Sequence, residues 1–179
     1  MKPSLRSLAL SAMFLALGLV LPFLTGQIPE IGNLLLPMHL PVLLCGLVCG
    51  WKYGLAVGFT TPLLRSMLFG MPTFYPSAVS MAFELAAYGL VIGLVFMQLK
   101  KKNILSVYIS LLASMLVGRA VWGIAMALLL IGGDGFTFAA FISGAFTTAF
   151  PGILLQLIIV PATVLALKRA KLVDFENKQ

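Results

Sequence analysis

Three charged side chains interrupt long apolar stretches of this chain, namely Arg65, Glu84 and Arg119. Inside a lipid bilayer a charge costs about 2.5–3.5 kcal/mol on insertion scales, so it is kept where it is paired, hydrated or used. Two guanidinium groups against one carboxylate leave one positive charge without an intramembrane partner. Because a guanidinium binds a carboxylate or phosphate bidentately, these residues predict a polar cavity for an anionic group. An internal Arg–Glu ion pair that only fixes helix packing is the alternative.

Other polar side chains could line the same cavity. His39, Asn33 and Gln27 fall near one shared end of the expected helices, where they could form a lid or simply be solvated. Tyr88 lies one helical turn from Glu84 and on the same helix face. These positions extend the predicted substrate-binding set beyond the three charges.

Aromatic residues near the cavity could stack on a flat ligand. Trp122 lies one turn from Arg119, and Tyr75 and Phe74 precede the helix that carries the carboxylate. For Tyr75 and Phe74, anchoring at the membrane interface is a strong alternative, because aromatic rings gather at that level. Gln156 lies deep in the last apolar stretch, where we favour a hydrogen bond between helices over a place at the cavity floor.

The elements that must position these residues are transmembrane helices. The chain of 179 residues is 61% hydrophobic and 9% charged, which is too apolar for a soluble domain. A span takes roughly 20 apolar residues, so the length predicts an all-α integral membrane protein, a six-transmembrane-helix bundle in one domain (1–179). The expected spans are 5–24, 39–50, 54–69, 77–99, 104–131 and 138–167, with a bend in the last at Pro151.

Basic residues give the bundle an orientation. Ten of the twelve lysines and arginines fall on the side of both termini. The loops expected on the opposite side carry only the acids Glu30 and Asp134. By the positive-inside rule, both termini are predicted to be cytoplasmic. The three intramembrane charges then lie away from the cytoplasmic face, so the cavity should open outward. The basic residues on the cytoplasmic side are Lys2, Arg6, Lys52, Lys100, Lys101, Lys102, Lys168, Arg169, Lys171 and Lys178.

Several function classes are disfavoured. The net charge of +7 does not indicate nucleic-acid binding, because the basic residues stand at helix ends rather than on one polar face. Cys45 and Cys49 share a helix face, but two cysteines and one histidine make no convincing zinc site, and no metal or cofactor is expected. Phosphate-loop, kinase, HExxH and GxSxG motifs are missing, which argues against an ATPase or a known hydrolase type.

Small residues recur four positions apart, as at Ala12 and Ala16 on the first span. Such pairs let helices approach closely, although the motif is common. On the first span it could receive a partner protein.

Five stretches in this order resemble the substrate-binding membrane subunits (S components) of energy-coupling factor (ECF) vitamin transporters. They are Leu36–Leu44 (LPMHLPVLL), Gly50–Gly54 (GWKYG), Thr61–Ser66 (TPLLRS), Met81–Gly89 (MAFELAAYG) and Gly118–Gly123 (GRAVWG). Each run alone is weak evidence, whereas their order on six spans of this size is more specific.

The resemblance implies a six-helix fold in a prokaryotic cell membrane that binds a vitamin or vitamin precursor at its outer end, under connecting loops. It also implies docking through alanines spaced as Ala12 and Ala16 onto a transmembrane coupling protein with two cytoplasmic ATPases. Excess positive charge at Arg65 and Arg119 favours a small carboxylate such as pantothenate. Pyridoxine- or hydroxymethylpyrimidine-like ligands come next, because Glu84 could bind an amine or hydroxyl.

Two other function classes remain open. An autonomous transporter or channel would move its ligand across liposomes without a partner. A membrane enzyme would use Glu84, His39 and an arginine, but one histidine and one intramembrane acid leave little room for a catalytic set. We therefore expect a binding subunit and no catalytic residues.

Overall fold

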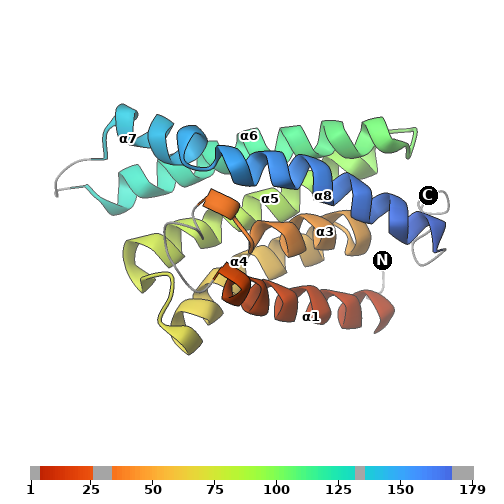
Figure 1. The fold of residues 1–179 in the computed structure, drawn as a ribbon, viewed down its shortest axis with the longest axis horizontal. Helices are drawn as coiled ribbons and strands as arrows, with labels where there is room; N and C mark the ends of the chain where they lie inside the picture. Colours follow the sequence, from red (N-terminus) through yellow and green to blue (C-terminus); the bar gives the residue numbers. More distant parts are fainter. Residues whose placement is uncertain (1–4, 26–33, 132–135, 171–179) are drawn as a thin grey trace.

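The computed structural model describes residues 5–25, 34–131 and 136–170. All regular structure in these ranges is helical, and it forms six segments in chain order, which confirms the all-α prediction (Figure 1). The elements are α1 (Leu5–Val20) with the 3-10 turn η1 (Leu21–Thr25), α3 (His39–Cys49), α4 (Trp51–Phe69), η2 (Phe74–Ala78), α5 (Val79–Gln98), α6 (Ile104–Leu129), α7 (Phe138–Ile142), η3 (Ser143–Thr147) and α8 (Phe150–Arg169).

The helices follow the predicted spans closely, with two differences. Helix α4 begins at Trp51, three residues before the expected start, because one residue, Gly50, suffices for the turn from α3. Its φ of 97° lies in the left-handed region, which glycine adopts without strain. The last span is interrupted at η3, before Pro151, rather than at that proline. Pro151 stands in the first turn of α8, where proline is tolerated because its missing N–H has no helical partner to lose.

Within the described ranges, four helical stretches are long and apolar enough to cross a membrane. They are Leu5–Leu24, Phe74–Gln98, Ile104–Leu129 and Phe138–Arg169. Many large apolar side chains on these stretches are exposed, as expected for a surface that faces lipid. Helix α3 has only 11 residues, or about 16 Å, and so is too short to span the hydrocarbon alone.

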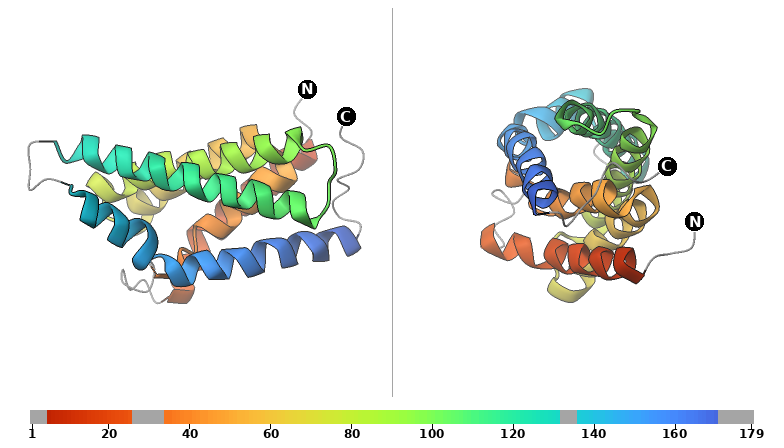
Figure 2. Two further views of the ribbon diagram at one scale, coloured as in Figure 1. Left: turned by 90° about the horizontal axis from the view of Figure 1, so that it is seen from above. Right: turned by 90° about the vertical axis from the view of Figure 1, so that its right-hand side faces the viewer.

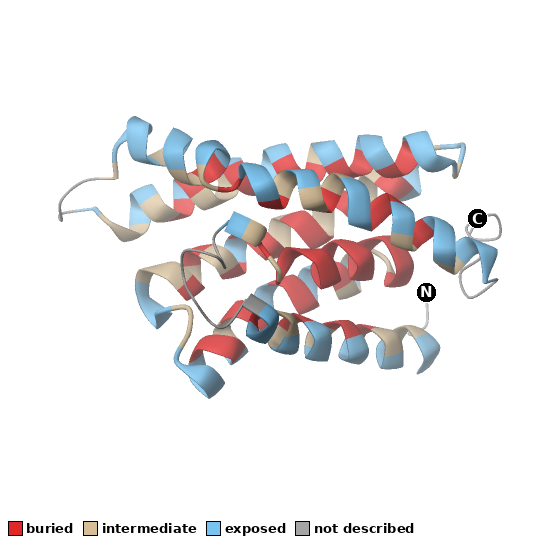
Figure 3. Ribbon diagram, in the orientation of Figure 1, coloured by how far each residue is buried: buried red, intermediate tan, exposed pale blue. Residues whose placement is uncertain are grey.

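Helix α3 is the centre of the bundle. Every residue from His39 to Cys49 is buried, whereas each neighbouring helix exposes one face (Figure 3). A helix that is apolar all round can be stable only when other helices cover all its sides. Helices α1, α4, α5 and α8 provide that cover. A polar side chain on α3 is therefore placed in the interior of the protein.

Helices α4 and α5 pack so closely that glycines form much of their contact. A Cβ atom at Gly89 would lie 2.2 Å from the carbonyl oxygen of Gly54, and one at Gly58 would lie 2.2 Å from that of Leu85. Small residues at such positions let two backbones meet directly. This contact holds Glu84 and Tyr88, both on α5, at a defined height beside α3.

Both described chain ends lie at one end of the bundle. The first turn of α1, the turn between α3 and α4, the connection between α5 and α6, and the last turn of α8 share that end (Figure 2). There the Lys102 ammonium donates to the carbonyls of Phe96, Met97 and Leu99 and so satisfies the end of α5. Asn103 caps α6 by accepting the Ser106 N–H at 3.0 Å.

Candidate functional site

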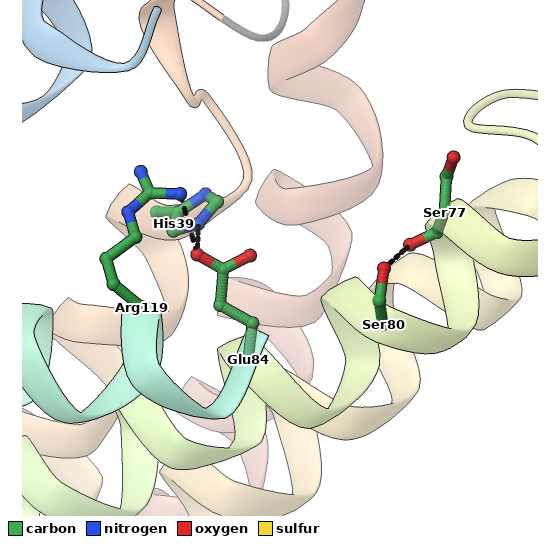
Figure 4. Close-up of polar contacts among 5 residues, drawn as sticks. All are labelled: His39, Ser77, Ser80, Glu84 and Arg119. Atoms are coloured by element: carbon green, nitrogen blue, oxygen red, sulfur yellow. Dashed lines mark hydrogen bonds and ion pairs between the residues drawn. The ribbon is translucent and has the colours of Figure 1, made fainter. Parts of the chain in front are cut away.

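A buried cluster of charged and polar groups joins three helices at Glu84. The Arg119 Nη1 on α6 donates to Glu84 Oε1 on α5 at 2.9 Å, and His39 Nε2 on α3 lies 3.4 Å from the same oxygen (Figure 4). The side chains of Arg119 and Glu84 are only 6% and 2% exposed. Burial in a medium of low dielectric strengthens this pair and makes each partner dependent on the other.

His39 lies in this cluster rather than in an outer lid. The expectation that it sits near the outer surface with Asn33 and Gln27 is wrong for His39, which is 0% exposed. The reason is that α3 begins inside the bundle, where every residue from His39 to Cys49 is buried. Asn33 and Gln27 lie outside the described residues.

Tyr88 extends the cluster one turn along α5, as the spacing from Glu84 predicts. Its ring meets the His39 ring edge-on, with centroids 5.1 Å apart. On its other side it packs against α6, where a Cβ at Gly118 would lie 2.3 Å from Cδ2 of the tyrosine ring. Gly118 was not predicted as part of the site, although its position next to Arg119 could have indicated a close contact. It leaves room for the Tyr88 ring beside the guanidinium.

Several polar atoms of these side chains are buried with no hydrogen-bond partner within the described ranges. Most buried polar atoms in proteins have a partner, so a group of exceptions needs an explanation. Arg119 and Tyr88 contribute donors, His39 contributes a ring nitrogen, and Gln156 on α8 contributes its whole amide. The atoms are His39 Nδ1, Tyr88 Oη, Arg119 Nε, Arg119 Nη2, Gln156 Nε2 and Gln156 Oε1. The hydrogen bond between helices that we favoured for Gln156 is not formed among these residues.

Arg65 is held elsewhere. Its Nη1 donates to the Leu19 carbonyl at the end of α1, and its guanidinium lies over the rings of Phe23 and Phe69 at 4.9 and 5.4 Å. Cation–π contacts of this kind satisfy a buried arginine without a carboxylate. The expectation that two arginines face Glu84 is therefore wrong for Arg65, because the end of α1, the turn after it and the end of α4 supply its partners.

The predicted aromatic residues stand around the opposite end of the bundle from the termini. Trp122 packs against Phe136 and Phe141, with ring centroids 5.5 and 6.2 Å away. Tyr75 is exposed, and its hydroxyl donates to the Leu129 carbonyl at the end of α6. Phe74 is also exposed. Tyr75 thus ties the α4–α5 connection to α6.

The geometry offers hydrogen bonds and charge but no metal shell. Among the described residues, no group of three His, Cys, Asp or Glu side chains could hold a metal ion. Cys45 and Cys49 are buried and reduced on α3. The chemistry of the cluster suits ligand binding. It combines a guanidinium, a carboxylate, a phenol and an imidazole, and several of their hydrogen-bond donors and acceptors are unused.

Comparison with known proteins identifies one family. The family profile described as "ECF transporter, substrate-specific component" matches residues 6–164. This range contains the whole polar cluster and both alanines of the predicted docking pair. No curated protein and no solved structure matches the chain.

Proposed function

Since the chain belongs to the substrate-specific components of ECF transporters, multi-pass proteins of the prokaryotic plasma membrane, we propose that it binds a vitamin or vitamin precursor at the cluster around Glu84. The family is one of transporter binding subunits, not of enzymes. The observation that carries the proposal is the set of buried, unpartnered polar atoms on His39, Tyr88, Arg119 and Gln156. A bound ligand would satisfy them, as buried polar groups require.

The charge of the cluster bears on the ligand class. Glu84 is already paired with Arg119, and Arg65 is paired instead with the Leu19 carbonyl and two phenylalanine rings. With His39 neutral, the cluster carries one positive and one negative charge. A carboxylate ligand would add an uncompensated negative charge, which is costly in a buried site. We therefore rank an uncharged, hydrogen-bonding ring of the pyridoxine or hydroxymethylpyrimidine kind ahead of pantothenate.

The Tyr88 and His39 rings support this ranking. Their edge-on contact places two buried aromatic rings next to the unused donors of Arg119. A flat heterocycle with ring nitrogens and hydroxyls that enters between the helices can stack on such rings and accept from the guanidinium. The substrate-binding set that we propose keeps His39, Tyr88, Glu84 and Arg119 at its centre and adds Gln156. Asn33, Tyr75 and Trp122 remain proposed only for the outer rim, and we propose no ligand contact for Arg65, which the Leu19 carbonyl and two rings hold.

The first test is to identify the ligand. We expect native mass spectrometry of the protein, purified in detergent from cells grown in rich medium, to show one bound small molecule without added ATP. Pyridoxine, hydroxymethylpyrimidine and pantothenate, each added to ligand-free protein, then rank the candidates by the rise in melting temperature. If no small molecule binds in either experiment, the proposed function is wrong. If only pantothenate binds, the charge argument is wrong.

The orientation that we propose has the shared end of the bundle, with both termini, in the cytoplasm. Apart from the buried Arg65 and Arg119, the basic residues in the described ranges lie at helix ends. These helix ends are the ones at the shared end of the bundle, as the positive-inside rule requires. The polar cluster then lies toward the outer half of the membrane, where the ligand would enter.

We further propose that Ala12 and Ala16 contact the transmembrane coupling protein, which works with two cytoplasmic ATPases. Both alanines are exposed on α1, whereas Ser11, Phe14 and Gly18 face the bundle. Replacing both alanines with leucine is expected to abolish co-purification with the coupling protein, because side chains of that size prevent close helix contact. Ligand affinity should be unchanged.

The control is Met13→Leu, which places a leucine at another exposed position of the same helix without adding volume. It should leave both co-purification and ligand affinity intact. Normal assembly of the Ala12→Leu, Ala16→Leu double variant would show that the docking face lies elsewhere.

A further inference from the structure

A hollow lined by lysines opens at the end of the bundle that holds both chain ends. Its volume is about 400 Å³, and its lining residues are Lys100, Lys101, Lys102, Asn103 and Lys168. The first four belong to the connection between α5 and α6, and Lys168 belongs to the last turn of α8. The positive-inside rule explains why lysines lie on this side of the membrane. That rule does not explain why Lys168 and the lysines at 100–102, which are distant in sequence, line the same hollow.

The positive charge of this hollow is not neutralised by the described part of the protein. Glu84 is the only acidic residue in the described ranges, and it is bound to Arg119 in the core. Lys102 is committed to the carbonyls at the end of α5, with Nζ–O distances of 3.0 Å to Met97 and 2.8 Å to Leu99. Lys100, Lys101 and Lys168 therefore remain available to an anion. The first turn of α6 adds the positive end of its helix dipole.

Apolar surface continues from the hollow along the same helices. Ile104 and Leu105 begin α6 beside Asn103 and are 39% and 61% exposed, and Leu165, one turn before Lys168, is 42% exposed. An anionic site bordered by exposed aliphatic side chains matches a molecule that is charged at one end and apolar at the other. Free phosphate would use only the lysines, and an acidic protein would not need the aliphatic border.

We propose that this hollow binds the phosphate group of an anionic phospholipid from the cytoplasmic leaflet, with the acyl chains along α6 and α8. Basic pockets at this level of a membrane protein favour such headgroups, because lysines near the membrane surface attract anionic lipids. The proposal uses the orientation given above and is independent of the vitamin site. It identifies a second binding site, at the opposite end of the bundle from the ligand entrance.

The test compares two lipids on the full chain purified in detergent. Native mass spectrometry should show phosphatidylglycerol bound about tenfold or more tightly than phosphatidylcholine with the same acyl chains. The variant Lys100→Gln, Lys101→Gln, Lys168→Gln should bind the two lipids equally. Replacing the same three lysines with arginine should retain the preference, because charge is kept. Inorganic phosphate at millimolar concentration should not displace phosphatidylglycerol.

The matched control is Lys52→Gln, which removes an exposed lysine at the same end of the bundle but outside the hollow. It should leave the lipid preference unchanged. If the triple glutamine variant does not fold, Lys100→Gln and Lys168→Gln, one from each wall, should each lose part of the preference.

Four results would overturn the proposal. If the wild-type protein binds both lipids equally, the proposed lipid site does not exist. If Lys52→Gln loses the lipid preference to the same extent as the triple glutamine variant, the preference arises from general surface charge. Displacement of phosphatidylglycerol by inorganic phosphate would indicate a free-phosphate site. A triple glutamine variant that binds lipid normally but fails to assemble with the coupling protein and ATPases would make the hollow a protein-docking surface.

Discussion

Replacing Arg119 with methionine is expected to abolish detectable ligand binding and to lower the free energy of unfolding by about 3–5 kcal/mol. The variant leaves the Glu84 carboxylate buried, with His39 at 3.4 Å as its one remaining partner among the described residues. It also removes the two unpartnered guanidinium nitrogens that we assign to the ligand. Stability is measured by thermal and denaturant unfolding in detergent, and affinity by titration with the ligand that co-purifies.

A second substitution separates the loss of stability from the loss of binding. Adding Glu84→Gln to Arg119→Met removes the stranded charge, so most of the lost stability should return, since the absence of a whole buried pair costs far less than the absence of one partner. Binding should not return. A stable double variant with wild-type affinity would show that the ion pair only fixes helix packing, which is the alternative to a ligand site.

Arg65→Met is the matched control, because it removes an equally buried arginine from the same bundle. Its partners are the Leu19 carbonyl at the end of α1 and the rings of Phe23 and Phe69, so the variant should lose stability. Its ligand affinity should stay within about threefold of wild type, a change of less than 1 kcal/mol. A loss of affinity as large as that of Arg119→Met would place Arg65 in the binding site.

Gly89→Ala should be nearly as destabilising, at about 3 kcal/mol or more, although it adds a single methyl group. The new Cβ would lie 2.2 Å from the Gly54 carbonyl oxygen, which belongs to a backbone and cannot rotate away. Helices α4 and α5 must then separate, and Glu84 and Tyr88 move with α5. We therefore expect a lower melting temperature together with weaker ligand binding.

Ala56→Leu is the control for the effect of added volume. Ala56 lies between Gly54 and Gly58 on α4, but it is exposed on the other face of the helix. Leucine there should change the melting temperature by only a few degrees, since surface substitutions cost little. If Gly89→Ala melts at the wild-type temperature, the close approach of α4 and α5 is not as described.

The amino-acid sequence by itself determined the class of the protein and most of its helices. Apolar runs of span length can satisfy their backbone groups in lipid only as helices, so composition and run length sufficed for the all-α prediction. The glycines, prolines and lysine runs between them located the helix ends, as at Lys100–Lys102. The three intramembrane charges were identified because each is costly in lipid wherever it points.

Only the tertiary structure decided which of those residues meet. Sequence spacing shows which residues share a face of one helix, such as Glu84 and Tyr88. It gives no information about the register of one helix against another. Register decided that Arg119, rather than Arg65, reaches Glu84, and that His39 lies in the core because α3 starts inside the bundle. It also brought Lys168 to Lys100 and Lys101. Contacts between helices depend on backbone approach at single glycines such as Gly89, and that approach is a property of the packed bundle, not of any one helix.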